Sequence, residues 1–176
     1  MRTGWPSDPG EPRPARFRQV VERLHELTGE WVWSPDPTLP DDPDPRDVKD
    51  EGLDIFVWKE VPDKRPGKLF VLGQCACGND YPTKFHDIDA NFEKLKKWVK
   101  PLSYATPLRA FATPRHIPNG AYFADVNHQA GLTFDRARIA LLAEGEGENL
   151  QRQARNLYAG LIRIVISSFQ VGQPVQ

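Results

Sequence analysis

Residues 53–76, LDIFVWKEVPDKRPGKLFVLGQCA, decide the fold of this chain. They contain two runs rich in β-branched and aromatic residues, 53–61 and 67–76, a composition typical of β-strands. The residues that join the runs include two prolines and a glycine, which favour a turn. We therefore expect two neighbouring antiparallel strands.

The residues before this hairpin predict a helix and then an acidic loop. Apolar residues recur at helical spacing from Phe17 to Leu27, and Gly29 stands where a helix commonly ends. Residues 34–52 hold five prolines and many aspartates, which disfavour both helix and sheet. Residues 1–14 are rich in proline, glycine and charge and are expected to be a disordered tail or the boundary with a longer chain.

The residues after the hairpin predict alternating helices and strands. Apolar residues at helical spacing from Phe85 to Val99 predict an amphipathic helix, and residues 108–114 and 121–126 predict two short strands. A helical stretch is expected from Phe134 to Leu142, and a last helix over residues 148–169. Residues 15–176 are thus expected to form one α/β domain, a central mixed sheet flanked by helices with a C-terminal helical extension.

The expected core of this sheet consists of apolar side chains from its strands: Phe56, Trp58, Leu69, Val71, Phe111 and Phe123.

Net charge, cysteine content and the length of apolar runs indicate the compartment and the surface charge expected of the chain. Its 176 residues carry a formal net charge of −1, so a DNA-binding surface would have to be local. The only cysteines, Cys75 and Cys77, are one residue apart and would point to opposite faces of a strand, which argues against a disulfide and for a reducing compartment. No apolar run approaches the length of a membrane span. We expect a soluble, cytoplasmic protein.

The hairpin predicts a candidate metal site. Asp54 opens the first strand and Gln74 ends the second, so antiparallel pairing would place them side by side at one edge of the sheet. Mg²⁺ or Mn²⁺ takes carboxylate, carboxamide and carbonyl oxygens, which Asp54, Gln74 and the carbonyl of Cys75 could supply. Phosphodiester hydrolysis also needs positive charge near the phosphate, and Lys84 is the lysine expected to provide it.

At three places the sequence resembles the PD-(D/E)XK (restriction-endonuclease-like) nuclease superfamily, in particular a bacterial branch related to Mrr-type restriction enzymes. These are FRQVVERLHELTG, then KDEGLDIFVW with GKLFVLGQCACGNDYPTK, and LTFDRARIALL. The resemblance implies a restriction-endonuclease-like core with glutamine, Gln74, in place of the usual second acidic residue. It also implies that Glu22 faces the metal site.

One residue departs from the family pattern. The family's lysine normally lies two residues after the position of Gln74, where this chain has Ala76. Lysine migration onto the following helix is a variation known in the superfamily, and Lys84 stands where such a lysine could reach back. Lys94 and Lys97 could hold DNA phosphates without reading the base sequence.

Taken together, the resemblance implies a Mg²⁺-dependent DNA endonuclease, a nuclease effector in bacterial defence. Further domains or subunits of a defence system and a homo-oligomer are compatible with it. The alternative function is a catalytically inactive nuclease-fold module for nucleic-acid binding or assembly.

Each candidate residue also has a structural interpretation. Asp54 could be a turn residue, Gln74 a buried amide that satisfies backbone groups, and Lys84 and Glu22 solvated surface residues. Asp135 could form an ion-pair brace with nearby arginines.

The cysteines allow two further alternatives. They could bind zinc or, as a nucleophile with a histidine base, support hydrolysis of the protease type, with His86, His116 or His128 as the histidine. Structural zinc usually takes CxxC pairs, and no local signature supports a Cys–His nucleophile.

Overall fold

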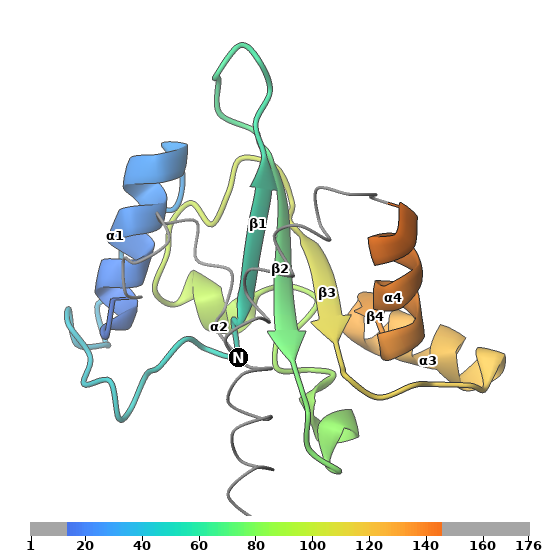
Figure 1. Ribbon diagram of the computed structural model, residues 1–176. Coiled ribbons are helices and arrows are strands. Elements are labelled where there is room, and N and C mark those ends of the chain that lie inside the picture. Colours follow the sequence, from blue (N-terminus) through green and yellow to red (C-terminus); the bar gives the residue numbers. More distant parts are fainter. Residues whose placement is uncertain (1–13, 146–176) are drawn as a thin grey trace, which may run out of the picture. The chain divides into compact units, whose positions relative to one another are not determined.

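The computed structural model describes residues 14–145 and confirms the α/β class. The chain divides into two compact units, Met1–Asp135 and Arg136–Gln176. The first contains α1 (Phe17–Thr28), β1 (Ile55–Lys59), β2 (Leu69–Cys75), the 3-10 helix η1 (Tyr81–Lys84), α2 (Glu93–Lys96), β3 (Leu108–Ala112), α3 (Gly120–Ala130) and β4 (Leu132–Phe134) (Figure 1).

In the second unit the structure describes one helix, α4 (Arg136–Gly145). It begins two residues later than the predicted helical stretch, because Phe134 ends a strand. The tail expected over residues 1–14, except Pro14, and the helix expected over 148–169 lie outside the described residues. Among residues 14–145, no helix combines the length and apolar character needed to cross a bilayer.

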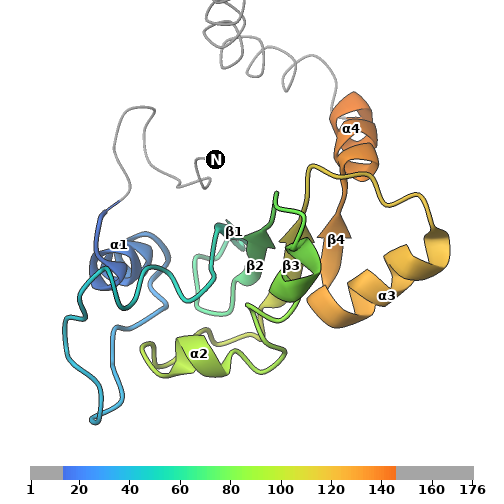
Figure 2. The ribbon, with the colours of Figure 1, turned by 90° about the horizontal axis from the view of Figure 1, so that it is seen from below.

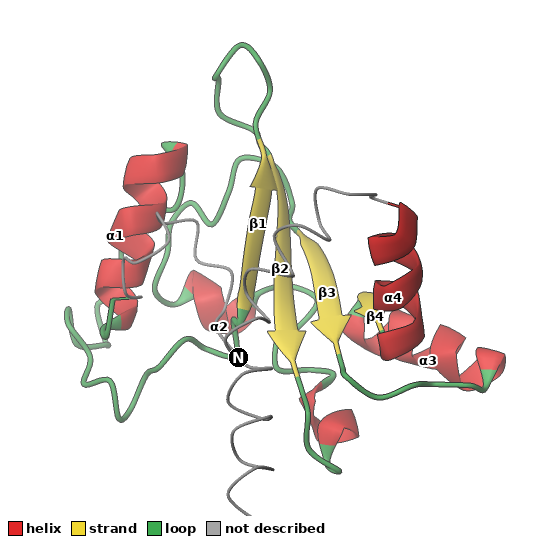
Figure 3. Ribbon diagram, viewed as in Figure 1, coloured by secondary structure: helices red, strands yellow, loops and turns green. Residues whose placement is uncertain are grey.

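The sheet is mixed and its strands follow the order β1-β2-β3-β4. β1 pairs with β2 antiparallel, whereas β2 with β3 and β3 with β4 are parallel pairs. The predicted hairpin and the strand beginning at Leu108 are therefore confirmed (Figure 3). Because β1 runs against the other three strands, its first residue lies at the edge of the sheet where β2, β3 and β4 end.

The strand predicted over residues 121–126 is wrong, because these residues belong to α3. Asn119 precedes the helix, and its side chain accepts a hydrogen bond from the backbone N–H of Tyr122. An N-cap of this kind satisfies an amide that a helix start leaves open. The fourth strand is instead Leu132–Phe134, beyond the end of α3.

One face of the sheet carries the core. The register pairs Phe56 with Leu72 and Trp58 with Phe70, so these side chains share a face, and α2 and α3 lie on the same side of the sheet in Figure 2. The buried cluster on this side combines apolar side chains from α1, from the loop that follows it, from β1 and β2 and from the segment between β2 and β3. Its members are Phe17, Val20, Val21, Leu24, Trp31, Leu53, Phe56, Phe70, Leu72, Ile88, Phe92, Leu95, Trp98, Val99 and Leu102.

Three of the six predicted core residues lie on this face, a fourth, Phe123, packs from α3 against a second buried cluster that includes Phe111, and two lie elsewhere. Phe56 and Phe111 are buried, and Trp58 and Phe123 are partly buried. The prediction was wrong for Leu69, which is 52% exposed. Leu69 and the half-buried Val71 alternate with Phe70 and Leu72, so they point to the opposite face.

The helix predicted from Phe85 to Val99 is wrong in extent, since only the four residues of α2 are α-helical. The carboxylate of Asp89 accepts hydrogen bonds from the N–H groups of Asn91 and Glu93, and Phe92 adopts a left-handed backbone conformation with φ 57°. Side-chain bonding of this type competes with a continuous helix. The apolar side chains that suggested the helix are nevertheless buried.

A buried carboxylate holds the far end of the hairpin. Glu30 follows α1 and accepts hydrogen bonds from the N–H groups of Gly67 and Lys68, from the Ser103 hydroxyl and from the N–H of Tyr104. Lys68 is also buried, and its ammonium donates to the carbonyl of Thr28 at 2.6 Å. This brace ties α1, the start of β2 and the loop around Tyr104 together, and thereby fixes the strands that carry Asp54 and Gln74.

Candidate functional site

Asp54 and Gln74 lie at the same edge of the sheet, where β1 begins and β2 ends. The β1–β2 pairing ends with Ile55 opposite Gly73, and Asp54 directly precedes this pair. The N–H of Asp54 donates to the carbonyl of Gly73 at 2.9 Å. The hairpin therefore brings both residues to one edge of the sheet, and their direct pairing stays a prediction.

The carboxylate of Asp54 also has a structural task. β1 begins at Ile55, two residues too late to pair with Cys75, and Asp54 Oδ2 accepts a hydrogen bond of 2.8 Å from the N–H of Cys75. A side-chain oxygen thus completes the strand pairing where the backbone of β1 no longer does. A bond from a backbone amide to a charged acceptor is stronger than one between neutral groups.

Gln74 supplies an open acceptor. Its Oε1 is buried, and within the described part of the chain it has no hydrogen-bond partner. Leaving a buried acceptor unsatisfied costs free energy, so such an atom in a folded protein calls for an explanation. A bound cation is one, because carboxamide oxygens are ligands for Mg²⁺ and Mn²⁺.

Cys75 does not have the character of a nucleophile or a thiolate ligand. Burial, the nearby Asp54 carboxylate and Cys77 raise the pKa of the Cys75 thiol to about 11, so it is protonated at neutral pH. Among residues 14–145, no three histidine, cysteine, aspartate or glutamate side chains are grouped to hold a metal. The protonated thiol argues against Cys75 as the zinc ligand or the nucleophile of the Cys–His alternative, while a metal contact through the Cys75 carbonyl stays a prediction.

Lys84 ends η1, and the described contacts connect it to this edge only indirectly. Its ammonium is 3.3 Å from Oδ2 of Asp87, and its side chain is 45% exposed. A Cβ on Gly52, two residues before Asp54, would lie 3.0 Å from Cβ of Asp87. Asp87 therefore packs against the segment that leads into Asp54, and it is the ion-pair partner of Lys84.

Sequence reasoning did not identify Asp87. Its spacing of three from Lys84 is compatible with an ion pair, but its contact with Gly52 depends on the tertiary fold. Lys94 also approaches Asp87, with 3.9 Å between its ammonium and Oδ1. Lys97 is exposed on the segment that follows α2.

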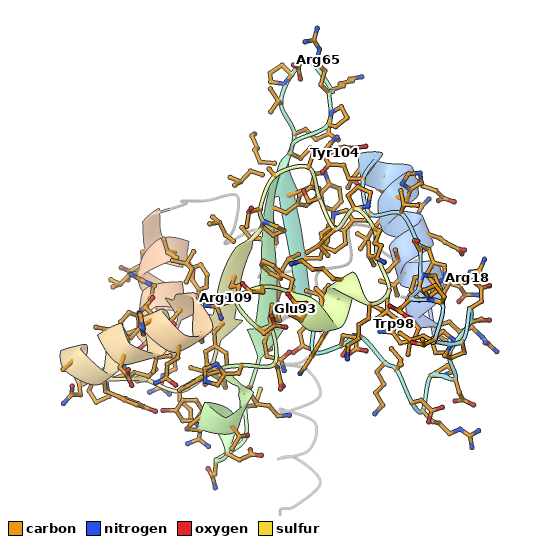
Figure 4. The ribbon with its side chains drawn as sticks, turned by 180° about the vertical axis from the view of Figure 1, so that it is seen from behind. Arg18, Arg65, Glu93, Trp98, Tyr104 and Arg109 are labelled. Atoms are coloured by element: carbon orange, nitrogen blue, oxygen red, sulfur yellow. The ribbon has the colours of Figure 1, made fainter. Side chains whose placement is uncertain are left out.

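The structure does not bring Glu22 to this edge. Glu22 is on the exposed face of α1, and its carboxylate accepts a hydrogen bond of 2.7 Å from Arg18, which Figure 4 labels on this helix. The side of α1 that packs on the core carries Val20, Val21 and Leu24 instead. Glu22 is thus a surface ion-pair residue, and its expected place at the metal site is corrected.

A second arrangement at the same edge joins the loop after β3 to the end of β4. Asp135, which is 3% exposed, accepts hydrogen bonds from the ring Nδ1 of His116 and from the N–H of Ile117, both at 3.0 Å. In the same loop Arg115 donates to the carbonyl of Gly78, 3.2 Å from its Nε. No sequence motif announced this pair, since its members are nineteen residues apart.

No protein-family model, no curated protein and no solved structure matches this chain.

Proposed function

We propose that this chain is a Mg²⁺-dependent endodeoxyribonuclease of the PD-(D/E)XK type. One observation carries the proposal: at the end of β2, the Asp54 carboxylate accepts a hydrogen bond from the N–H of Cys75, the residue after a glutamine, Gln74, whose buried Oε1 has no hydrogen-bond partner among the described residues. Oxygen donors of this kind suit a hard cation. The resemblance to the superfamily at the same two positions supports the same function.

Asp54 and Gln74 are the residues that would hold the metal ion, with the carbonyl of Cys75. Mg²⁺ is commonly bound by only one or two protein carboxylates and completes its shell with water and substrate phosphate, so the small donor set is compatible with it. When bound, the ion would supply Lewis-acid stabilisation of charge on the phosphate and help to activate the attacking water.

Lys84 is the proposed catalytic cation. Its ion pair with Asp87, which packs against Gly52, supports this role, because Gly52 is two residues before Asp54. A fixed positive charge there would offset the negative charge that develops on the phosphate during hydrolysis. Lys94 and Lys97 would hold phosphates of the bound DNA, a contact that carries no sequence information.

The resemblance alone supports the biological setting, a nuclease effector of bacterial defence against foreign DNA.

A second candidate is an inactive module that keeps the nuclease fold. The hydrogen bond from the Cys75 N–H to Asp54 favours it, because it gives Asp54 a role that needs no metal. Ala76, at the usual lysine position, favours it as well, since it is 6% exposed and carries no charge.

Relaxation of supercoiled plasmid separates the two candidates. The wild-type chain should nick plasmid with Mg²⁺ and lose this activity in EDTA, and Asp54→Asn should be inactive under both conditions. Asp47→Asn is the matched control, because Asp47 is an exposed carboxylate in the loop before β1. If the wild type fails to nick plasmid with Mg²⁺ or Mn²⁺, or if Asp54→Asn nicks at the wild-type rate, the proposed enzyme is refuted.

A further inference from the structure

The carboxylate of Asp135 fixes the ring of His116. Asp135 directly follows β4 and is buried, and its Oδ2 is 3.0 Å from Nδ1 of His116. An ionised carboxylate only accepts hydrogen bonds, so Nδ1 carries the hydrogen in this pair. The ring atom on the other side, Nε2, therefore carries a lone pair when His116 is neutral and a second N–H when it is protonated.

His116 is not a core histidine. Its side chain is 48% exposed, whereas the side chain of Asp135 is 4% exposed. The loop is also held without the ring, because the N–H of Ile117 donates to the same oxygen of Asp135. The imidazole is thus oriented by a buried group and accessible to a ligand.

The loop that carries His116 lies beside the residues that follow Gln74. Ala112, the last residue of β3, accepts a hydrogen bond from the N–H of Ala76 at 3.0 Å, and Arg115 donates to the carbonyl of Gly78. The guanidinium of Arg115 also lies 5.8 Å from the centre of the Tyr81 ring. Arg115, the residue before His116, therefore connects this loop to the segment that follows β2.

The spacing of the strands gives the length of DNA that could contact both Gln74 and the His116–Asp135 pair. Gln74 is on β2 and Asp135 follows β4, two strands away. Strands lie about 4.8 Å apart, so the two positions are separated by roughly 10 Å across the sheet. One strand of duplex DNA advances about 3.4 Å per nucleotide, so this separation corresponds to about three nucleotides.

We propose that His116 is a substrate-contacting residue whose Nε2 donates a hydrogen bond to a DNA phosphate flanking the scissile one, and that Asp135 is its positioning residue. This inference rests on the proposed DNA substrate. The charged group that contacts the imidazole is the carboxylate of Asp135, and the guanidinium of the neighbouring residue Arg115 lies over the ring of Tyr81.

DNA binding without turnover tests the contact. Fluorescence anisotropy would measure the affinity for a short labelled duplex, with Ca²⁺ in place of Mg²⁺, at mildly acidic pH, because only the protonated ring carries a hydrogen on Nε2 in this pair. His116→Ala should bind about tenfold more weakly, since it loses a hydrogen bond between charged groups. The slope of log affinity against log salt should become shallower by about 0.9, the value for one phosphate contact.

Two further variants control this measurement. His116→Asn keeps a side-chain donor for Asp135 but has no Nε2, so it should show the same loss with the loop in place. His25→Ala is the matched control, because His25 is also exposed, with Nδ1 3.0 Å from the carbonyl of Glu30, but it is on α1. It should bind like the wild type.

The outcomes separate this inference from the proposed function. Wild-type affinity and slope in both His116 variants would overturn the contact, whatever the nicking assay shows. A wild type that binds DNA but does not nick plasmid, with weaker binding by both His116 variants, would support the contact and refute the enzyme. A wild type that binds no DNA would overturn both.

Discussion

Removal of the Glu30 carboxylate should strongly destabilise the first unit. Glu30 is 1% exposed, and Glu30→Ala leaves four donors without their acceptor: the N–H groups of Gly67, Lys68 and Tyr104 and the hydroxyl of Ser103. It also leaves the ammonium of Lys68, which lies 3.9 Å from the carboxylate, buried without its counter-charge.

The size of the effect follows from this environment. Breaking a buried charge pair by removal of one partner typically costs about 3–5 kcal/mol of unfolding free energy. For a chain of this size, each kcal/mol lowers the melting temperature by about 2–4 °C, so a fall of about 6–20 °C is expected. Glu26→Ala is the matched control, because the side chain of Glu26 is 63% exposed and pairs with Arg23 on the surface of α1. It should change stability by less than about 1 kcal/mol.

The same carboxylate makes stability depend on pH. Burial alone would raise the pKa of Glu30, but the hydrogen bonds from Lys68, Gly67, Tyr104 and Ser103 together lower it below its ordinary value of 4.5. A lowered pKa contributes stability above that ordinary value, and the contribution is lost as the pH falls through the pKa of the folded state.

Urea denaturation from neutral to acidic pH would measure both effects. The wild type should lose unfolding free energy as the pH falls below about 4.5, and Glu30→Gln, which has no ionisable group there, should lose less. Glu30→Ala and Glu26→Ala of equal stability at neutral pH would refute the brace.

Three further predictions concern the candidate site. Asp54→Asn keeps an oxygen that can accept the hydrogen bond from Cys75, so it should lose nicking activity with little change in melting temperature. Asp54→Ala should lose nicking activity and also about 1.5–3 kcal/mol of unfolding free energy, and an inactive Ala variant of wild-type stability would show that the hydrogen bond contributes little. Gln74→Glu should keep or raise the calorimetric affinity for Mn²⁺, because a carboxylate is the stronger ligand, and weaker binding would make Gln74 a structural amide. Lys84→Ala should still bind Mn²⁺ but lose about 10²- to 10³-fold in nicking rate. Lys94→Ala should mainly weaken DNA binding as the salt concentration rises. Equal, mild defects in both variants would show that Lys84 is an ordinary surface lysine.

The hairpin and its site pair could be predicted because both depend on local information. Two β-rich runs and one turn set the register, and that register brings Asp54 and Gln74 to the same edge of the sheet. The first helix was equally accessible, since its apolar spacing and Gly29 are local signals, and Gly29 does end α1 in a left-handed conformation with φ 71°.

The region after β2 was less predictable because side chains there compete with the backbone. The apolar spacing from Phe85 to Val99 correctly indicated burial, but the bonds of Asp89 to backbone N–H groups prevent a long helix. Residues 121–126 became helical through the cap of Asn119, which outweighed their strand-like composition.

The partners of charged side chains could not be predicted, since they come together only in the folded chain. Glu22 stands at the position where the resemblance implies a glutamate facing the metal site, but it pairs with Arg18 on the surface of α1. Lys84 was identified without Asp87, the residue that connects it to the segment before Asp54.

A crystal of the chain soaked in Mn²⁺ tests the central claim most directly, because anomalous scattering locates the ion without any assay of turnover. The proposed site predicts a peak at about 2.0–2.3 Å from Oε1 of Gln74 and from a carboxylate oxygen of Asp54, and its absence in Asp54→Asn crystals. A Gln74 side chain with no ion beside it at saturating Mn²⁺, or an ion held only elsewhere on the chain, would contradict the account.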